Sequence, residues 1–385
     1  MKKYILTAML LLPITIFAGH PHPTKTDLFT DRIIRLTYNL EFSKALETVE
    51  TELQNNPGSM QLKFFHAMIL FRQSNYFKFQ SDLGYDKNRE KFPSLHDTAV
   101  SELNKIIESG NNILKSNPED TTALFYAGAA YGEIGQDFAR SGKFFKALSE
   151  GKKGLNYHVK LMKLCPDWDD IYLSEGIYNF FASSVPWFIK PLLWIMGRSG
   201  SESEAEKDLK VACGGRYSKY EALDYLALLY FRQKNVDAAV PIVHKLIEDF
   251  PNARFYHLVY FGFFLINNDM LEESEKLLNE SVSAVDHETL NELNKYEIGD
   301  LYFYLAYKYK EKGKYDKVIR LWKEEIKGNY IPANESWGYL EMGNSYLEIG
   351  EKAEAKNCFE WILNNSKVEK HIKEAKEKLK DMGDG

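Results

Sequence analysis

Residues 220–253 read YEALDYLALLYFRQKNVDAAVPIVHKLIEDFPNA, and this stretch decides the fold. Leu226, Ala227 and Tyr230 are separated by spacings of three and four residues, which place them on one face of a first helix. A second helix repeats that spacing with Ala239 and the larger apolar residues after it. A proline near the end of the stretch stops the second helix. The small alanines let the helices approach closely, so the stretch predicts a helix pair.

The same spacing recurs along the chain at intervals of about 34 residues. The residues that carry it are Ala45, Val49 and Pro57, then Ala127, Gly128 and Tyr131, then Gly176, Ala205, Leu209 and Ala212, then Gly262, Leu305 and Ala306, and finally Met342, Gly343, Tyr346, Ala355 and Phe359. The pattern resembles the tetratricopeptide repeat. The resemblance implies an all-α fold, a right-handed α-solenoid (superhelix) of about eight helix pairs over residues 19–385. Charged residues on most sides of 367–381 predict a C-terminal capping helix.

Three insertions interrupt this period. The first lies within residues 72–102, which contain glycine, proline and many polar residues, and we expect a loop there between two helices. The second falls in the unit that begins at Thr121 and is close to four helical turns long. We therefore expect both helices of that unit to be longer by two turns, with the turn near Ser141 and Gly142.

The third insertion, residues 183–200, reads SSVPWFIKPLLWIMGRSG and is strongly apolar, although a turn between helices is usually exposed and polar. Its two prolines and Lys190 argue against a membrane-spanning helix. Three interpretations remain open: the segment packs on neighbouring repeats, docks a partner, or lies on a membrane surface. In the last two, the expected contact residues are Trp187, Phe188 and Trp194.

The residues around this insertion also resemble a signature of the tetratricopeptide-repeat protein 39 family. The similarity covers roughly residues 120–250 and rests on Gly176, Tyr178, Asn179, Ser183, Pro186, Gly197 and Gly200. This resemblance implies an all-helical scaffold without known catalytic residues.

In proteins similar to this chain, fixed positions of each first helix line the concave surface of the solenoid. Mapped onto the sequence, they form a candidate partner-binding groove of Phe125, Ile177, Phe180, Phe181, Asp224, Phe231, Arg232, Tyr256, Phe263, Asp300, Phe303, Tyr307, Trp337 and Asn344. Aromatic surfaces are typical of binding hot spots, so the groove predicts a non-enzymatic scaffold that takes an extended or helical segment of a protein or peptide partner. The competing interpretation is that the chain itself covers many of these residues, for instance with residues 183–200.

Composition and motifs argue against other functions. The formal net charge of −6 gives no basic field for nucleic acid. No recognised catalytic motif occurs, so an unrecognised hydrolase, with a carboxylate pair in the groove, is the second alternative. We predict no cofactor and no metal. Pro21 between His20 and His22 lacks the N–H that an amino-terminal copper chelate needs, and the acidic run at 167–170 lacks the glycine of a calcium loop.

The cysteines, Cys165, Cys213 and Cys358, are scattered and form no CxxC pair. An odd, scattered set is a poor disulfide framework. We expect all three to be packing residues, because free cysteine is often buried.

Residues 1–18 have the pattern of a signal peptide. Lys2 and Lys3 precede an uncharged apolar run, and small residues follow it. We therefore expect a mature chain that begins near Gly19 and is exported, in a Gram-negative bacterium to the periplasm. The first alternative is association with the outer membrane through residues 183–200. The sequence does not indicate an oligomeric state.

Overall fold

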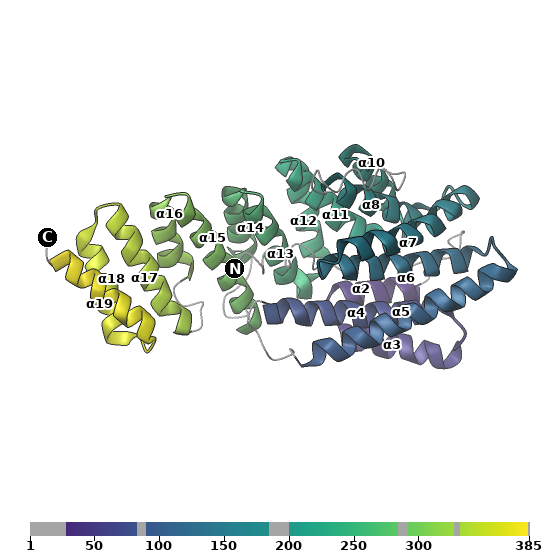
Figure 1. Cartoon of the computed structure of the whole chain (residues 1–385), viewed down its shortest axis with the longest axis horizontal. Coiled ribbons are helices and arrows are strands. Elements are labelled where there is room, and N and C mark those ends of the chain that lie inside the picture. The colour runs from purple at the N-terminus through teal and green to yellow at the C-terminus, as the bar shows by residue number, and fades with distance from the viewer. Residues whose placement is uncertain (1–27, 83–89, 185–199, 284–291, 327–331, 384–385) are drawn as a thin grey trace. The chain divides into compact units, whose positions relative to one another are not determined.

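The computed structural model describes residues 28–82, 90–184, 200–283, 292–326 and 332–383. All regular secondary structure in these residues is helical, and they contain no β-strand (Figure 1). The fold is therefore all-α, an α-solenoid of successive helix pairs, as the repeat pattern predicts. The chain divides into two compact units, Met1–His257 and Leu258–Gly385, which we call the N-terminal unit and the C-terminal unit.

The N-terminal unit consists of helices that follow one another in pairs (Figure 1). They are α2 (Leu28–Tyr38), α3 (Phe42–Asn55), α4 (Met60–Asp82), α5 (Lys91–Ser116), α6 (Thr121–Arg140), α7 (Phe144–Leu164), α8 (Tyr172–Ser184), α10 (Glu202–Ala212), α11 (Lys219–Arg232) and α12 (Val236–Asp249). A 3₁₀ turn, η2 (Asp169–Ile171), leads into α8. Another, η3 (Pro251–Ala253), leads into α13 (Arg254–Asn267), which continues into the C-terminal unit.

The C-terminal unit continues the pattern of paired helices. Its further elements are α14 (Leu271–Ser283), α15 (Glu292–Glu311), α16 (Tyr315–Arg320), the π-helix η4 (Leu321–Ile326), α17 (Pro332–Glu348), α18 (Lys352–Asn365) and α19 (Glu369–Gly383). Gly313 and Gly350 adopt positive φ angles of 69° and 85° in two of the turns, a conformation that favours glycine. The last helix, α19, is the predicted cap: Ala375 is 0% exposed, while its lysine and glutamate side chains are largely exposed.

Helices α11 and α12 form the pair that residues 220–253 predict. Their core face is buried as the spacing requires, and its residues are Leu226, Ala227, Tyr230, Ala239, Val243 and Leu246. Lys234, in the short turn between the helices, takes a left-handed conformation with a φ of 59°. Pro251 follows the end of α12 and opens η3, so it does terminate the second helix.

Helices α6 and α7 confirm the predicted extension of their unit. The turn between them falls at Ser141 and Gly142, and Gly142 has a φ of 73°. The helices approach so closely that a Cβ built on Gly154 would lie 2.5 Å from the carbonyl oxygen of Gly128. A side chain at either position would push the two backbones apart, so this close pairing depends on glycine.

The prediction of a loop within residues 72–102 is wrong for the described part of that range, which is almost entirely helical. Helices α4 and α5 occupy it on both sides of residues 83–89, which lie outside the described residues. Pro93 belongs to the first turn of α5, where proline is tolerated because its missing N–H has no helical partner there. Apolar residues stabilise both helices: Phe79 on α4 is 1% exposed and Leu103 on α5 is 0% exposed.

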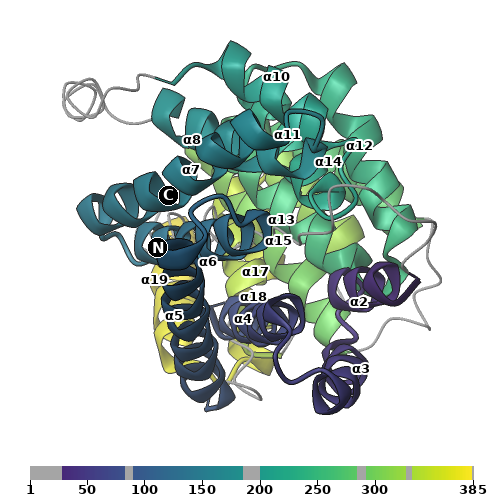
Figure 2. The same ribbon diagram turned by 90° about the vertical axis from the view of Figure 1, so that its right-hand side faces the viewer.

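The N-terminal unit closes on itself through its first helix pair. Tyr38, the last residue of α2, stacks on Phe250 after α12 with ring centroids 5.3 Å apart, and the Arg72 guanidinium of α4 lies 3.8 Å from the Tyr38 ring. The backbone N–H of Asn252 donates to Asn39 Oδ1 at 3.0 Å. Helix α2 packs on α3, as Figure 2 shows, and it also contacts α4. The beginning and the end of the unit therefore touch and enclose its interior.

Two predicted segments lie outside the described residues. These are the signal peptide, residues 1–18, and residues 185–199 of the apolar insertion with Trp187, Phe188 and Trp194. Among the described residues, none of the helices is both long enough and apolar enough to cross a membrane.

Candidate functional site

The predicted groove positions differ between the two units in their exposure. In the N-terminal unit most are enclosed by the chain itself, and the buried ones are Phe125, Ile177, Phe180, Asp224, Phe231 and Tyr256. Phe181 and Arg232 are half-buried there. In the C-terminal unit the predicted positions are all half-buried, and they are Phe263, Asp300, Phe303, Tyr307, Trp337 and Asn344. The predicted groove positions are therefore, as a group, more accessible in the C-terminal unit than in the N-terminal unit.

Aromatic packing accounts for the enclosure in the N-terminal unit. Phe125 stacks on Trp168 with ring centroids 4.7 Å apart and is 0% exposed. Tyr256 of α13 meets Tyr76 and Phe79 of α4 edge-on, at 5.7 and 5.3 Å between centroids. A partner would reach these side chains only after the surrounding helices had separated. Their role in partner binding stays a prediction.

Arg232 connects the two ends of the insertion between α8 and α10. Its guanidinium donates to the carbonyl oxygen of Phe180 at 3.0 Å and to Ser183 Oγ at 2.9 Å, both near the end of α8. It also forms an ion pair with Glu202 at the start of α10, with Nε 2.8 Å from Oε1. The planar group lies 4.3 Å from the centroid of the Phe180 ring. The structure thus assigns this predicted groove residue a role in holding α8 and α10 together.

Buried ionisable groups occur in the enclosed interior of the N-terminal unit. Asp224 on α11 and His257 on α13 are each 2% exposed, and Asp224 Oδ1 lies 3.9 Å from His257 Nδ1. Burial raises the pKa of Asp224 to about 7, although the nearby Arg72 opposes this shift. Burial lowers the pKa of His257 to about 3, and Arg72 lowers it further. Both side chains therefore stay mostly uncharged in the folded protein between these two pKa values.

A small cavity lies among these ionisable groups. It is bounded by Arg72, Asp224 and His257 and measures about 20 Å³, which is room for about one water. On α6, Glu133 is 1% exposed, and burial raises its pKa to about 8 against the opposing charges of Arg140 and Arg72. Grouped ionisable side chains, which would favour a hydrolase, thus surround a cavity with room for about one water. We interpret them as ionisable side chains that become enclosed, mostly in their uncharged forms, when the unit closes.

Several partly exposed aromatic residues of the C-terminal unit lie on α13, α15 and α17. We call them the aromatic face: Phe263, Phe303, Tyr304, Tyr307 and Trp337. Phe303 stacks on Trp337 with ring centroids 4.3 Å apart and planes 11° apart. Phe263 packs against Tyr304 at 5.4 Å, and the Tyr304 hydroxyl donates to Asn267 Oδ1 at 3.0 Å. These contacts fix the rings in place, so the face is largely preformed.

Charged groups accompany the aromatic face. The Lys308 ammonium lies 5.6 Å from the ring centroids of both Tyr304 and Tyr307. On the same helix, burial raises the pKa of Asp300 to about 7. The sequence mapping missed Tyr304 and Lys308. The available signal was their spacing of four and eight residues from Asp300, which places all three on one side of α15.

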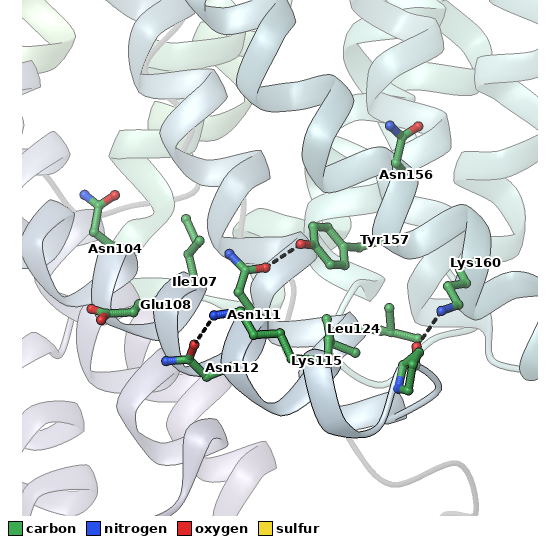
Figure 3. A pocket seen from close by; sticks show the side chains of 12 residues that line it. Asn104, Ile107, Glu108, Asn111, Asn112, Lys115, Leu124, Asn156, Tyr157 and Lys160 are labelled. Atoms are coloured by element: carbon green, nitrogen blue, oxygen red, sulfur yellow. Dashed lines mark hydrogen bonds between the residues drawn. The ribbon is translucent and has the colours of Figure 1, made fainter.

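A further open pocket of about 870 Å³ lies on the N-terminal unit between α5, the start of α6 and α7 (Figure 3). Amide side chains from Asn104, Asn111, Asn112 and Asn156 line much of it. Several polar groups already have partners within the chain: the Tyr157 hydroxyl donates to Asn111 Oδ1, and Lys160 donates to the carbonyl oxygen of Pro118, each at 2.5 Å. Such a pocket can hydrogen-bond a polar ligand. The repeat positions do not predict this pocket, because its size depends on the distance between α5 and α7, the second helices of two successive helix pairs.

The acidic run at 167–170 has a structural role. Asp170 is 3% exposed and accepts hydrogen bonds from the backbone N–H groups of Tyr217 and Ser218, each at 2.8 Å. Its carboxylate therefore joins η2 to the start of α11. Among the described residues, no group of three or more His, Cys, Asp or Glu side chains is placed to hold a metal ion.

The cysteines are free thiols in partly or fully buried positions. Cys358 is buried, whereas Cys165 and Cys213 are half-buried. Burial raises the pKa of both Cys213 and Cys358 to about 11. These two thiols are therefore poor nucleophiles, in agreement with a packing role.

Comparison with known proteins supports the repeat assignment. A family model of the tetratricopeptide repeat matches residues 221–253, which form α11, α12 and η3, so the chain contains a tetratricopeptide repeat there. Similar solved structures include human IFIT1 as a dimer with m7Gppp-AAAA, at 14% identity over 99% of this chain and 85% of that chain, with a TM-score of 0.38. A tetratricopeptide repeat protein from Parabacteroides merdae is 17% identical over 80% of this chain and 96% of that chain, with a TM-score of 0.32. Yeast Tom70 is 13% identical over 92% and 88%, with a TM-score of 0.29. No curated protein matches the chain, and the resemblance to the tetratricopeptide-repeat protein 39 family stays a prediction.

Proposed function

We propose that this chain is an exported, non-enzymatic scaffold that holds a segment of a partner protein against the aromatic face. The observation that carries the proposal is the difference in exposure between equivalent repeat positions. They are mostly enclosed in the N-terminal unit and remain half-exposed in the C-terminal unit. Half-exposed aromatic rings held by their neighbours suit binding hot spots, because they offer a large apolar area and lose little conformational freedom.

The partner segment that fits this face carries apolar side chains, in an extended or a helical conformation. The stacked pair of Phe303 and Trp337 offers the flattest apolar contact. Lys308 adds an ammonium on α15, which can select a partner segment with a negative charge at a matching position. Asp300 adds a carboxyl group on the same helix that can form a hydrogen bond, since burial raises its pKa to about 7.

Site-specific photo-crosslinking tests the proposal. A photoreactive phenylalanine analogue replaces Tyr307 of the aromatic face or, as a control, Tyr315, which is half-buried at the start of α16. The protein crosslinked through position 307 is identified by mass spectrometry and purified. We expect Tyr307→Ala to raise its Kd at least about tenfold, the effect of losing a hot-spot contact, and Tyr315→Ala to leave it within about twofold. Equal crosslinking at both positions, or an unchanged Kd for Tyr307→Ala, contradicts the proposal.

Export is a separate part of the proposal, supported by the sequence of residues 1–18. Lys2, Lys3 and the apolar run after them match the pattern of a secretory signal. Mass spectrometry of the protein from a periplasmic extract should find a first residue near Gly19. Recovery of the intact chain with Met1 from the cytoplasm would contradict export and would leave the scaffold proposal standing.

A further inference from the structure

A second cavity lies within the C-terminal unit, and it is lined by residues outside the aromatic face. It is bounded by η4, α17 and α18 and measures about 280 Å³, room for roughly nine waters at 30 Å³ each. Its aromatic lining consists of Trp322, Tyr339, Tyr346 and Trp361. This volume is at the lower end of the range for small-molecule pockets, so the cavity fits a compact head group.

Gly338 and the π-helix η4 together position Trp322 in the wall of the cavity. A Cβ built on Gly338 of α17 would overlap the ring of Trp322, so the indole packs directly on the helix at this position. Trp322 belongs to η4 and is 3% exposed. π-Helical segments are frequent at functional sites, and the wider turn changes the direction of the side chains. Opposite η4, Tyr339 stacks on Trp361 with ring centroids 3.8 Å apart and planes 15° apart.

Charged side chains around the cavity favour a cation. Glu335 of α17 and Glu354 of α18 contribute two carboxylates to the lining, and Lys323 of η4 contributes an ammonium. That ammonium lies 5.2 Å from the centroid of the Tyr346 ring, within the distance of about 6 Å that is typical of cation–π contacts. The chain itself thus places one ammonium against the aromatic lining.

We propose that this cavity binds an alkylammonium group, supplied by a small molecule or by a lysine side chain of a bound protein. The faces of the aromatic rings attract a cation through their quadrupoles, and Glu335 and Glu354 balance its charge. An anionic ligand would instead meet these two carboxylates. The inference does not depend on a partner at the aromatic face, because the lining residues are different.

Choline and its uncharged carbon isostere, 3,3-dimethylbutan-1-ol, test the proposal by isothermal titration calorimetry on the full chain at constant ionic strength. Choline should bind saturably, and the isostere should bind at least about tenfold more weakly. An acetylated and amidated Gly-Lys-Gly peptide forms a second arm. Tighter binding of the peptide than of choline indicates a protein lysine as the natural source, and the reverse order indicates a small molecule. Equal binding of choline and its isostere, or no saturable binding of choline and of the peptide, overturns the proposal.

Variants with matched controls distinguish binding of the cationic charge from nonspecific binding in an apolar pocket. Lys323→Met removes the resident ammonium of η4 and should lower the Kd of choline at least about threefold. The matched control is Lys356→Met, which removes an exposed ammonium of α18 that does not line the cavity. Glu354→Gln should raise the Kd at least about threefold, whereas Glu360→Gln on the same helix should leave it unchanged. All four side chains are exposed, so these changes preserve the fold. Equal affinities across the four variants would exclude cation recognition.

Discussion

Replacement of Asp224 by asparagine should stabilise the N-terminal unit at neutral and alkaline pH. Asp224 Oδ1 is buried without a hydrogen-bond partner among the described residues, and burial raises the pKa of this carboxyl from 3.8 to about 7. Since one pKa unit corresponds to about 1.36 kcal/mol, ionising the carboxyl in the folded protein costs about 4 kcal/mol more than in the unfolded chain. Asparagine has the shape of the protonated carboxyl and does not ionise, so it removes that cost.

The direction of the shift fixes the pH window. Because the folded-state pKa of Asp224 lies above its unfolded-state pKa, the folded protein holds this proton more tightly between about pH 4 and pH 7. The stabilisation from the protonated carboxyl is complete below pH 4 and is lost as the pH rises through 7. The free energies of unfolding of the Asp224→Asn variant and the unchanged protein should therefore agree within about 1 kcal/mol at pH 4. At pH 8 the variant should be more stable by about 4 kcal/mol.

Urea unfolding followed by circular dichroism at pH 4, 6 and 8 measures this difference. Comparing the two proteins at the same pH cancels the contribution of His257, whose pKa burial lowers to about 3 and whose stabilisation is lost toward acid pH. Asp167→Asn, at an exposed position, is the matched control and should stay within about 0.5 kcal/mol at every pH. If Asp224 is instead ionised and paired with Arg72, Asp224→Asn will be less stable at pH 8 and the difference will shrink toward pH 4. That result would refute the reasoning.

Three further predictions concern contacts described above. Tyr38→Ala should destabilise the N-terminal unit by about 3–5 kcal/mol and make residues 28–55 sensitive to limited proteolysis. Tyr38→Phe keeps the ring and should have neither effect. Equal digestion of both variants would show that the closure depends on other contacts. Arg232→Lys should increase hydrogen exchange at the end of α8 and the start of α10, because an ammonium does not reproduce the forked contacts of a guanidinium, and unchanged exchange would contradict this role. At pH 8, Cys213 and Cys358 should react with iodoacetamide about a hundredfold more slowly in the folded than in the unfolded protein, because burial raises the pKa of each from 9.0 to about 11; similar rates would be inconsistent with that burial.

The helix pairs were predictable because each repeat contains the information for its own fold. The spacing of Leu226, Ala227 and Tyr230 places them on one face of α11, and these residues are buried as predicted, although the rest of the unit buries most other residues of α11 as well. The turn at Gly142 was predictable for the same reason: a glycine next to a polar residue allows the positive φ that ends α6. The prediction of a loop around Pro93 was wrong because the effect of proline depends on its position in a helix. Proline interrupts a helix in its interior but is accepted in the first turn, where Pro93 lies.

The closure of the N-terminal unit was not predictable from the repeats. It depends on Tyr38 meeting Phe250 and on Asn39 meeting Asn252, contacts between residues that are more than 200 positions apart. No repeat spacing encodes such a contact, since each repeat specifies only its immediate neighbours. The same long-range contacts decide which groove positions are accessible. Equivalent aromatic residues therefore have different roles in the two units.

Helix α13 shows this dependence within a single element. Tyr256 and Phe263 are seven residues apart, so they lie on the same side of the helix. Tyr256 is 8% exposed because Tyr76 and Phe79 of α4 pack edge-on against it, whereas Phe263 packs against Tyr304 of α15 and remains half-exposed. The repeat position determines the direction of a side chain, and the closure of the chain determines whether a partner can reach it. A search for the partner should therefore begin at the aromatic face, where direction and access coincide.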